Sequence, residues 1–69
     1  MRISARNVLK GRVKEIKHGT VNAEVTIELP GGMQVVAMIT DASVAALNLA
    51  VGREAYAVIK ASNVMVAVD

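Results

Sequence analysis

Apolar and polar residues alternate without a break over residues 21–29, Val-Asn-Ala-Glu-Val-Thr-Ile-Glu-Leu. Alternation with a period of two is typical of a β-strand that has one buried face and one solvent-exposed face. Pro30-Gly31-Gly32 follows and predicts a turn, after which residues 33–39 return as a second strand that is almost entirely apolar. The two segments are therefore predicted to form a β-hairpin.

Three further strands and one helix are predicted around this hairpin. The strands cover residues 8–17, 54–60 and 64–68, and Gly11 is expected to mark a bulge or bend in the first of them. The helix is predicted at residues 40–49, because Thr40 or Asp41 can cap its start and Gly52 is placed to end it or to turn the chain after it. This order of elements is typical of an all-β, five-stranded OB-type barrel with one short helix between strands 3 and 4. Residues 1–69 are expected to form one such domain.

Two of the predicted strands have no polar face. Residues 35–39 and 64–68 contain only Val, Ala, Met and Ile, and strands of this kind are covered on both sides in folded proteins. A chain of 69 residues leaves little to cover them and is marginally stable alone. Because the chain has no cysteine, it cannot be stabilised by disulfides or by thiolate zinc sites. The sequence therefore predicts an oligomer in which other copies of the chain cover these strands.

The charge pattern favours an anionic partner. The net charge is only +2, but five of the eight Lys and Arg residues lie within residues 2–14. We find no apolar run long enough to span a membrane and no export signal at the N-terminus. On this basis the protein is expected to be soluble and cytoplasmic.

Three polar clusters stand out against the apolar background: Ser4-Ala5-Arg6-Asn7, Thr40-Asp41-Ala42-Ser43 and Lys60-Ala61-Ser62-Asn63. Their hydroxyls, their two cations and the backbone N–H groups beside small residues are hydrogen-bond donors, which together suit a doubly charged oxyanion. Taken one at a time, the clusters also fit a solvated terminal segment, a helix cap and a surface turn. Sequence spacing leaves open whether they meet in space. No nucleophile–base pair is present, since His18 is the only imidazole, so an enzyme is not expected.

Four motifs in this order resemble the molbindin (Mop) family, which consists of small cytoplasmic molybdate-binding proteins built on a TOBE-type OB domain. They are Ser-Ala-Arg-Asn at 4–7, Gly-Thr-Val-Asn-Ala-Glu-Val at 19–25, Ile-Thr-Asp-Ala-Ser at 39–43 and Ala-Val-Ile-Lys-Ala-Ser at 57–62. The resemblance covers residues 2–68. It implies a homohexamer, arranged as a trimer of dimers, with molybdate as ligand and no other cofactor.

The resemblance also implies which residues bind the anion. Molybdate would lie between subunits, held by Ser4 and Arg6, by Thr40 and Ser43 of a neighbouring chain, and by the turn that contains Lys60, Ala61 and Ser62. A second class of anion site, built largely from backbone, would use His18, Gly19, Thr20, Val21 and Asn22. Many family members have Ala where this chain has Thr20, and His18 also fits an ordinary solvated turn residue.

The sequence is compatible with three functions. The first is storage or buffering of molybdate, with tungstate as a second cargo. The second is an OB-fold nucleic-acid-binding module, which ranks lower because such modules stack bases on aromatic side chains and this chain has one aromatic residue, Tyr56. The third is a regulatory or structural TOBE module of the kind that is fused to transporters and transcription regulators.

Overall fold

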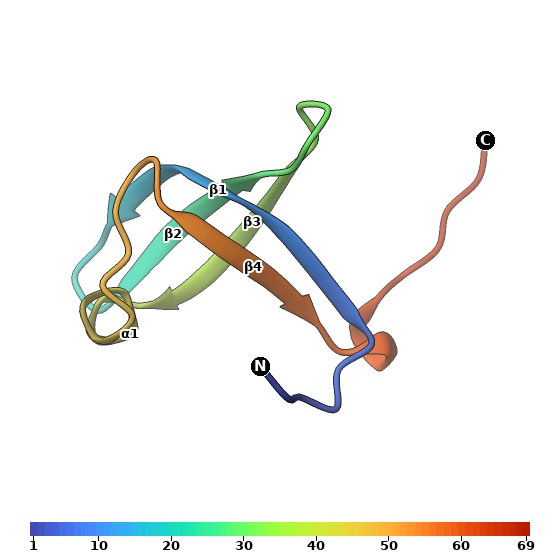
Figure 1. Ribbon diagram of the computed structural model, residues 1–69, viewed down its shortest axis with the longest axis horizontal. Helices are drawn as coiled ribbons and strands as arrows, with labels where there is room; N and C mark the ends of the chain where they lie inside the picture. Colours follow the sequence, from blue (N-terminus) through green and yellow to red (C-terminus); the bar gives the residue numbers. More distant parts are fainter.

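The computed structural model describes residues 1–69 and contains a single antiparallel sheet with the strand order β3-β2-β1-β4. Its elements, in chain order, are β1 (Asn7–His18), β2 (Asn22–Glu28), β3 (Gln34–Thr40), the helix α1 (Asp41–Ala46), β4 (Glu54–Ile59) and the 3₁₀ turn η1 (Ala61–Asn63). The sheet curls into a half-barrel, with α1 at one end and η1 beside the N-terminal segment at the other (Figure 1). The predicted 21–29 and 33–39 hairpin is confirmed as β2 and β3.

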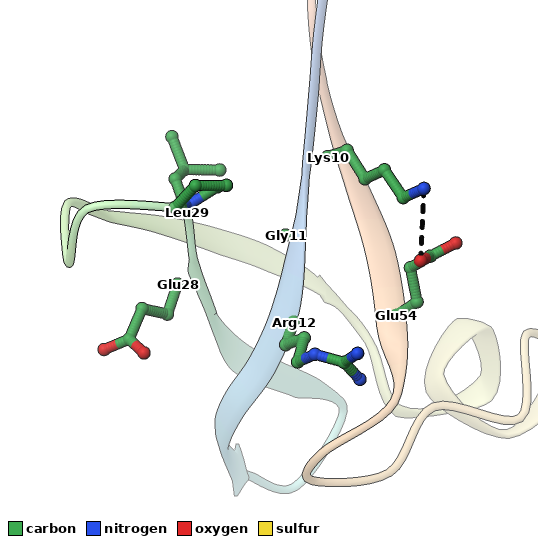
Figure 2. Close-up of a pocket in the computed structure, with 7 residues that line it drawn as sticks. Lys10, Gly11, Arg12, Glu28, Leu29 and Glu54 are labelled. Atoms are coloured by element: carbon green, nitrogen blue, oxygen red, sulfur yellow. Dashed lines mark ion pairs between the residues drawn. The ribbon is translucent and has the colours of Figure 1, made fainter.

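The first strand, β1, is long because its two halves pair with different neighbouring strands. Residues 7–12 of β1 pair with β4, and residues 12–18 pair with β2. Gly11 lies where the strands approach closely, since a Cβ atom there would come within 2.4 Å of the Glu28 carbonyl oxygen. Figure 2 shows Gly11 on β1 between the end of β2 and β4. The irregularity in pairing lies instead between Val13 and Glu15, so the bulge predicted at Gly11 is displaced, and the glycine is required for the close approach.

The core is small and follows the alternation of β2. Its buried apolar side chains come from β1, β2, α1 and β4, and they are Val13, Ala23, Val25, Ile27, Val44 and Ala57. Only 8 of the 69 residues are buried, so an isolated chain has little apolar burial to offset the entropy lost on folding.

The helix is shorter than the sequence predicts. Thr40, one of the two candidates, is its N-cap, and the Thr40 hydroxyl oxygen accepts a hydrogen bond from the Ser43 N–H at 3.0 Å. At the other end the N–H groups of Asn48 and Leu49 donate to the carbonyls of Ala45 and Val44, which is a Schellman motif. Asn48 adopts the left-handed conformation (φ 54°) and ends the helix, whereas Gly52 (φ 92°) belongs to the next turn.

The main difference from the prediction is the fifth strand. Residues 64–68 form no strand: the chain leaves η1 and runs away from the sheet (Figure 1), and the Met65 and Val66 residues are 94% and 90% exposed. The predicted fifth strand is therefore wrong for this chain: the sheet has four strands, and the barrel is open between β3 and β4. β3 does have two apolar faces, as expected, and Val36 and Met38 on its outer face are 60% and 64% exposed.

Neither helical element has the length and apolar character needed to cross a bilayer.

Candidate oxyanion-binding site

Two of the three polar clusters meet in one cleft at the η1 end of the sheet. Asn7, the first residue of β1, pairs with Ile59, the last residue of β4, and its side-chain amide donates to the Ile59 carbonyl at 3.1 Å. Because β1 and β4 are antiparallel, the segment before β1 and the turn after β4 lie at the same end of the sheet. The cleft has a volume of about 610 Å³ and is lined by Ile3, Ser4, Ala5, Arg6, Val58, Lys60, Ala61, Ser62 and Asn63.

This cleft carries two uncompensated positive charges. Arg6 and Lys60 line it, and no aspartate or glutamate does. Neither cation takes part in an ion pair within the chain, whereas the three lysines of β1 each lie within 4 Å of a glutamate. The Ser4 and Ser62 hydroxyls add donors, and the Ala61 N–H stands at the start of a 3₁₀ turn, where backbone N–H groups have no acceptor within the turn. The cleft therefore presents donors and positive charge to an anion.

The third cluster lies at the opposite end of the half-barrel, where Thr40 and the first turn of α1 stand (Figure 1). Thr40 and Ser43 do not line the cleft, so no single chain brings together all seven residues of the predicted molybdate site. The Thr40 hydroxyl donates to the Ser43 Oγ at 2.8 Å while it accepts from the Ser43 N–H. This arrangement leaves the Ser43 hydroxyl proton free to donate to a group outside the chain.

Next to this cluster is the turn between β1 and β2, which contains the predicted second anion site. Its Gly19 N–H donates to the Asn22 carbonyl at 2.7 Å, and its Val21 carbonyl accepts from the Asp41 N–H at 2.8 Å. The N–H groups of Thr20 and Val21 donate to no backbone carbonyl in the chain. These two amides are therefore the donors that the turn offers.

Sequence reasoning missed one interaction in this region. The Nδ1 atom of His18 lies 2.7 Å from an Asp41 carboxylate oxygen, so the histidine is not simply a solvated turn residue. The two residues are 23 positions apart. Only the pairing of β1 with β2 and of β2 with β3, which sets His18 opposite Ala23 and Thr40 opposite Asn22, brings them together.

A second polar hollow, of about 330 Å³, lies where β1 passes the end of β2 (Figure 2). It does not have the character of an anion site, because Glu28 and Glu54 line it together with Lys10 and Arg12. The Lys10 ammonium lies 3.3 Å from the Glu54 carboxylate, and an Arg12 Nη atom donates to the Gly52 carbonyl at 3.0 Å. No group of three His, Cys, Asp or Glu residues that could hold a metal ion is present.

Comparisons with known proteins find relatives of similar sequence and fold. The TOBE domain model matches residues 3–66. The probable molybdenum-pterin-binding protein of Haemophilus influenzae is 54% identical over 69 residues, which is the full length of both chains. The structure of MopII from Clostridium pasteurianum, an apo form, superposes with a TM-score of 0.92 at 43% identity and covers 97% of this chain and 100% of that one. The cytoplasmic molybdate-binding protein ModG, with molybdate bound, superposes with a TM-score of 0.91 at 55% identity, over 94% of this chain and 46% of that one.

Proposed function

This chain belongs to the TOBE domain family, among its small molbindin (Mop) members, and we propose that it binds molybdate, with tungstate as a second cargo, at interfaces between copies of itself. The observation that carries the proposal is the cleft in which Arg6 and Lys60 stand together without a carboxylate. A tetrahedral oxyanion with two negative charges would be neutralised there by the two cations, and its oxygens would accept hydrogen bonds from the surrounding donors.

In the proposed site each chain supplies the five residues Ser4, Arg6, Lys60, Ala61 and Ser62. The cleft is open to solvent, and its volume of about 610 Å³ exceeds what a four-oxygen ion fills. We assign the remaining contacts to Thr40 of the partner subunit and Ser43 of the partner subunit. The separation of these two hydroxyls from the cleft within one chain supports a site that only an oligomer completes. The assembly we propose is a hexamer, arranged as a trimer of dimers.

The chemistry of the cleft favours an oxyanion over a pterin, although relatives of this chain carry the name molybdenum-pterin-binding protein. A pterin ring is planar and aromatic and is typically held by stacking on an aromatic side chain. None of the cleft residues is aromatic, and Tyr56, the only aromatic residue of the chain, lines a different groove.

A second class of site is proposed at the turn formed by His18, Gly19, Thr20, Val21 and Asn22. The donors there are the Thr20 and Val21 N–H groups, which have no backbone acceptor within the chain. His18, when protonated, would balance the Asp41 carboxylate beside it, which would otherwise repel an anion.

The role we propose is passive storage and buffering of the oxyanion in the cytoplasm. Binding of this kind needs only hydrogen bonds and charge balance. The pairing of the His18 ring, the only imidazole of the chain, with Asp41 and not with a hydroxyl supports binding over catalysis.

Native mass spectrometry with and without sodium molybdate tests the proposal, because it reports the number of subunits and bound ions together. We expect an oligomer of the 7.2 kDa chain whose mass rises by a whole number of molybdate ions, with sulfate at the same concentration producing no such rise. Salt-dependent binding of a single-stranded oligonucleotide with no uptake of molybdate would instead favour the nucleic-acid-binding function.

A further inference from the structure

An ion pair joins the turn of residues 18–22 to the start of α1. The Nδ1 atom of His18 lies 2.7 Å from an Asp41 carboxylate oxygen, and the two side chains are 59% and 30% exposed. The Asp41 backbone is fixed to the same turn, since its N–H donates to the Val21 carbonyl at 2.8 Å. The Asp41 carboxylate is therefore held close to the turn whose Thr20 and Val21 N–H groups are the donors of the proposed second anion site.

Within the chain, only His18 can balance the Asp41 carboxylate. Asp41 lies within 4 Å of no lysine or arginine, and β3 and α1 contain no other charged residue. Lys17 on β1 and Glu24 on β2 are paired across the two strands, and they lie on the face of the sheet opposite to His18, because successive side chains of a strand alternate. The Lys17 ammonium lies 3.9 Å from the Glu15 carboxylate instead. The net charge at the turn therefore depends on whether His18 is protonated.

The geometry of the pair also fixes the atom at which the ring gains a proton. A carboxylate only accepts hydrogen bonds, so we assign the ring hydrogen of neutral His18 to Nδ1, which lies 2.7 Å from Asp41. The Nε2 atom of the neutral ring is then an acceptor, which repels an oxyanion as the carboxylate does. When Nε2 gains a proton, it becomes a donor, and the ring balances the Asp41 charge. A single proton therefore removes the negative charge at the turn and adds a hydrogen-bond donor.

We propose that the anion site of this turn is proton-linked: an oxyanion binds there together with a proton on His18 Nε2 and is released as the pH rises. Histidine is the side chain whose charge ordinarily changes between about pH 5 and about pH 8, whereas lysine and arginine stay charged throughout that range. The cleft lined by Arg6 and Lys60 therefore keeps its anion at pH values at which the turn loses its own. An unbalanced carboxylate within several ångströms of a dianion weakens binding about tenfold in water. This inference rests on the proposed function, because it assigns a regulation to the second of the two proposed sites.

Equilibrium dialysis of the wild-type protein against sodium molybdate, at about pH 6 and at about pH 8, tests the proposal. Two classes of bound anion are expected at the lower pH, and one of them is expected to bind about tenfold more weakly at the higher pH. Arg6→Ala should weaken the class that does not respond to pH. Equal uptake by the wild type at the two pH values would overturn the proposal and leave molybdate binding intact, whereas no uptake at either pH would reject the proposed function as well.

Two variants of the pair identify the group that carries the proton. His18→Gln keeps an N–H donor but gains no proton, so the pH-sensitive class is expected to bind weakly at both pH values. Because His18→Gln meets the same molybdate solutions as the wild type, it also controls for protonation of the anion itself. Asp41→Asn removes the charge that His18 balances, so at about pH 8 this class should bind about tenfold more tightly than in the wild type. A tenfold response to pH that persists in His18→Gln, or wild-type affinity at the higher pH in Asp41→Asn, would overturn the proposal.

Discussion

Replacing Arg6 with alanine removes one of the two cations that line the cleft and leaves Lys60 in place. The Arg6 side chain takes part in no ion pair or side-chain hydrogen bond within the chain, so its loss breaks no polar contact of the fold. The expected effect is therefore confined to anion binding, with the oligomer intact.

The size of the effect follows from the kind of contact. A hydrogen bond to a charged group contributes about 1.5–3 kcal/mol, and we count one such bond between the Arg6 guanidinium and the oxyanion. Because about 1.4 kcal/mol corresponds to a factor of ten in the dissociation constant, Arg6→Ala is expected to weaken molybdate binding by about 10- to 150-fold.

Arg2→Ala is the matched control. It removes the same side chain and the same charge four positions away, at a residue that does not line the cleft. A unit charge about 10 Å from the anion contributes at most about 0.4 kcal/mol in water, and salt reduces this further, so the change should stay within about twofold.

Isothermal titration calorimetry with sodium molybdate at physiological salt measures both variants, and light scattering verifies that each remains assembled. Equal affinities for Arg6→Ala and Arg2→Ala would refute the assignment of Arg6 to the site, since the loss would then reflect net charge alone. Loss of assembly in Arg6→Ala would show that the side chain stabilises an interface instead.

Three further predictions concern the stability of the fold, measured without molybdate. Gly11→Ala is expected to lower the free energy of unfolding in urea by about 1–3 kcal/mol, because its Cβ would come within 2.4 Å of the Glu28 carbonyl oxygen; an unchanged midpoint would contradict the close approach. Asn48→Ala is expected to lower the free energy of unfolding by about 1 kcal/mol in the same assay, because the Asn48 backbone is in the left-handed conformation, whereas Asn48→Gly should not lower it. Equal losses in the two variants would argue against this end of the helix. Thr40→Ala removes the N-cap hydrogen bond, which contributes about 1 kcal/mol, and should lower Tm in a thermal melt by about 4–8 °C. Thr40→Ser keeps the hydroxyl and should keep the wild-type Tm, so similar losses in both variants would exclude the cap as the cause.

The family could be inferred from the sequence, and the chemistry of the proposed site predicted from it, because both depend on residue types in a fixed order. The alternation of residues 21–29 was sufficient to predict β2, since a strand with one wet face leaves a period of two in the chain. The helix start at Thr40 was equally local, because capping involves residues only three positions apart. Ser4, Arg6 and Lys60 were recognised as anion-binding candidates from their chemistry alone.

The tertiary structure decided which of these residues meet. The pairing of Asn7 with Ile59 brings the first and third polar clusters into one cleft, and this contact spans 52 positions that no local pattern records. Likewise, the His18–Asp41 contact and the role of Gly11 depend on strand register, and the apolar pattern of residues 64–68 did not reveal that this segment forms no strand. Local patterns determine what each segment can form, whereas long-range pairing determines what each segment touches, and in this protein the proposed binding site depends on the second.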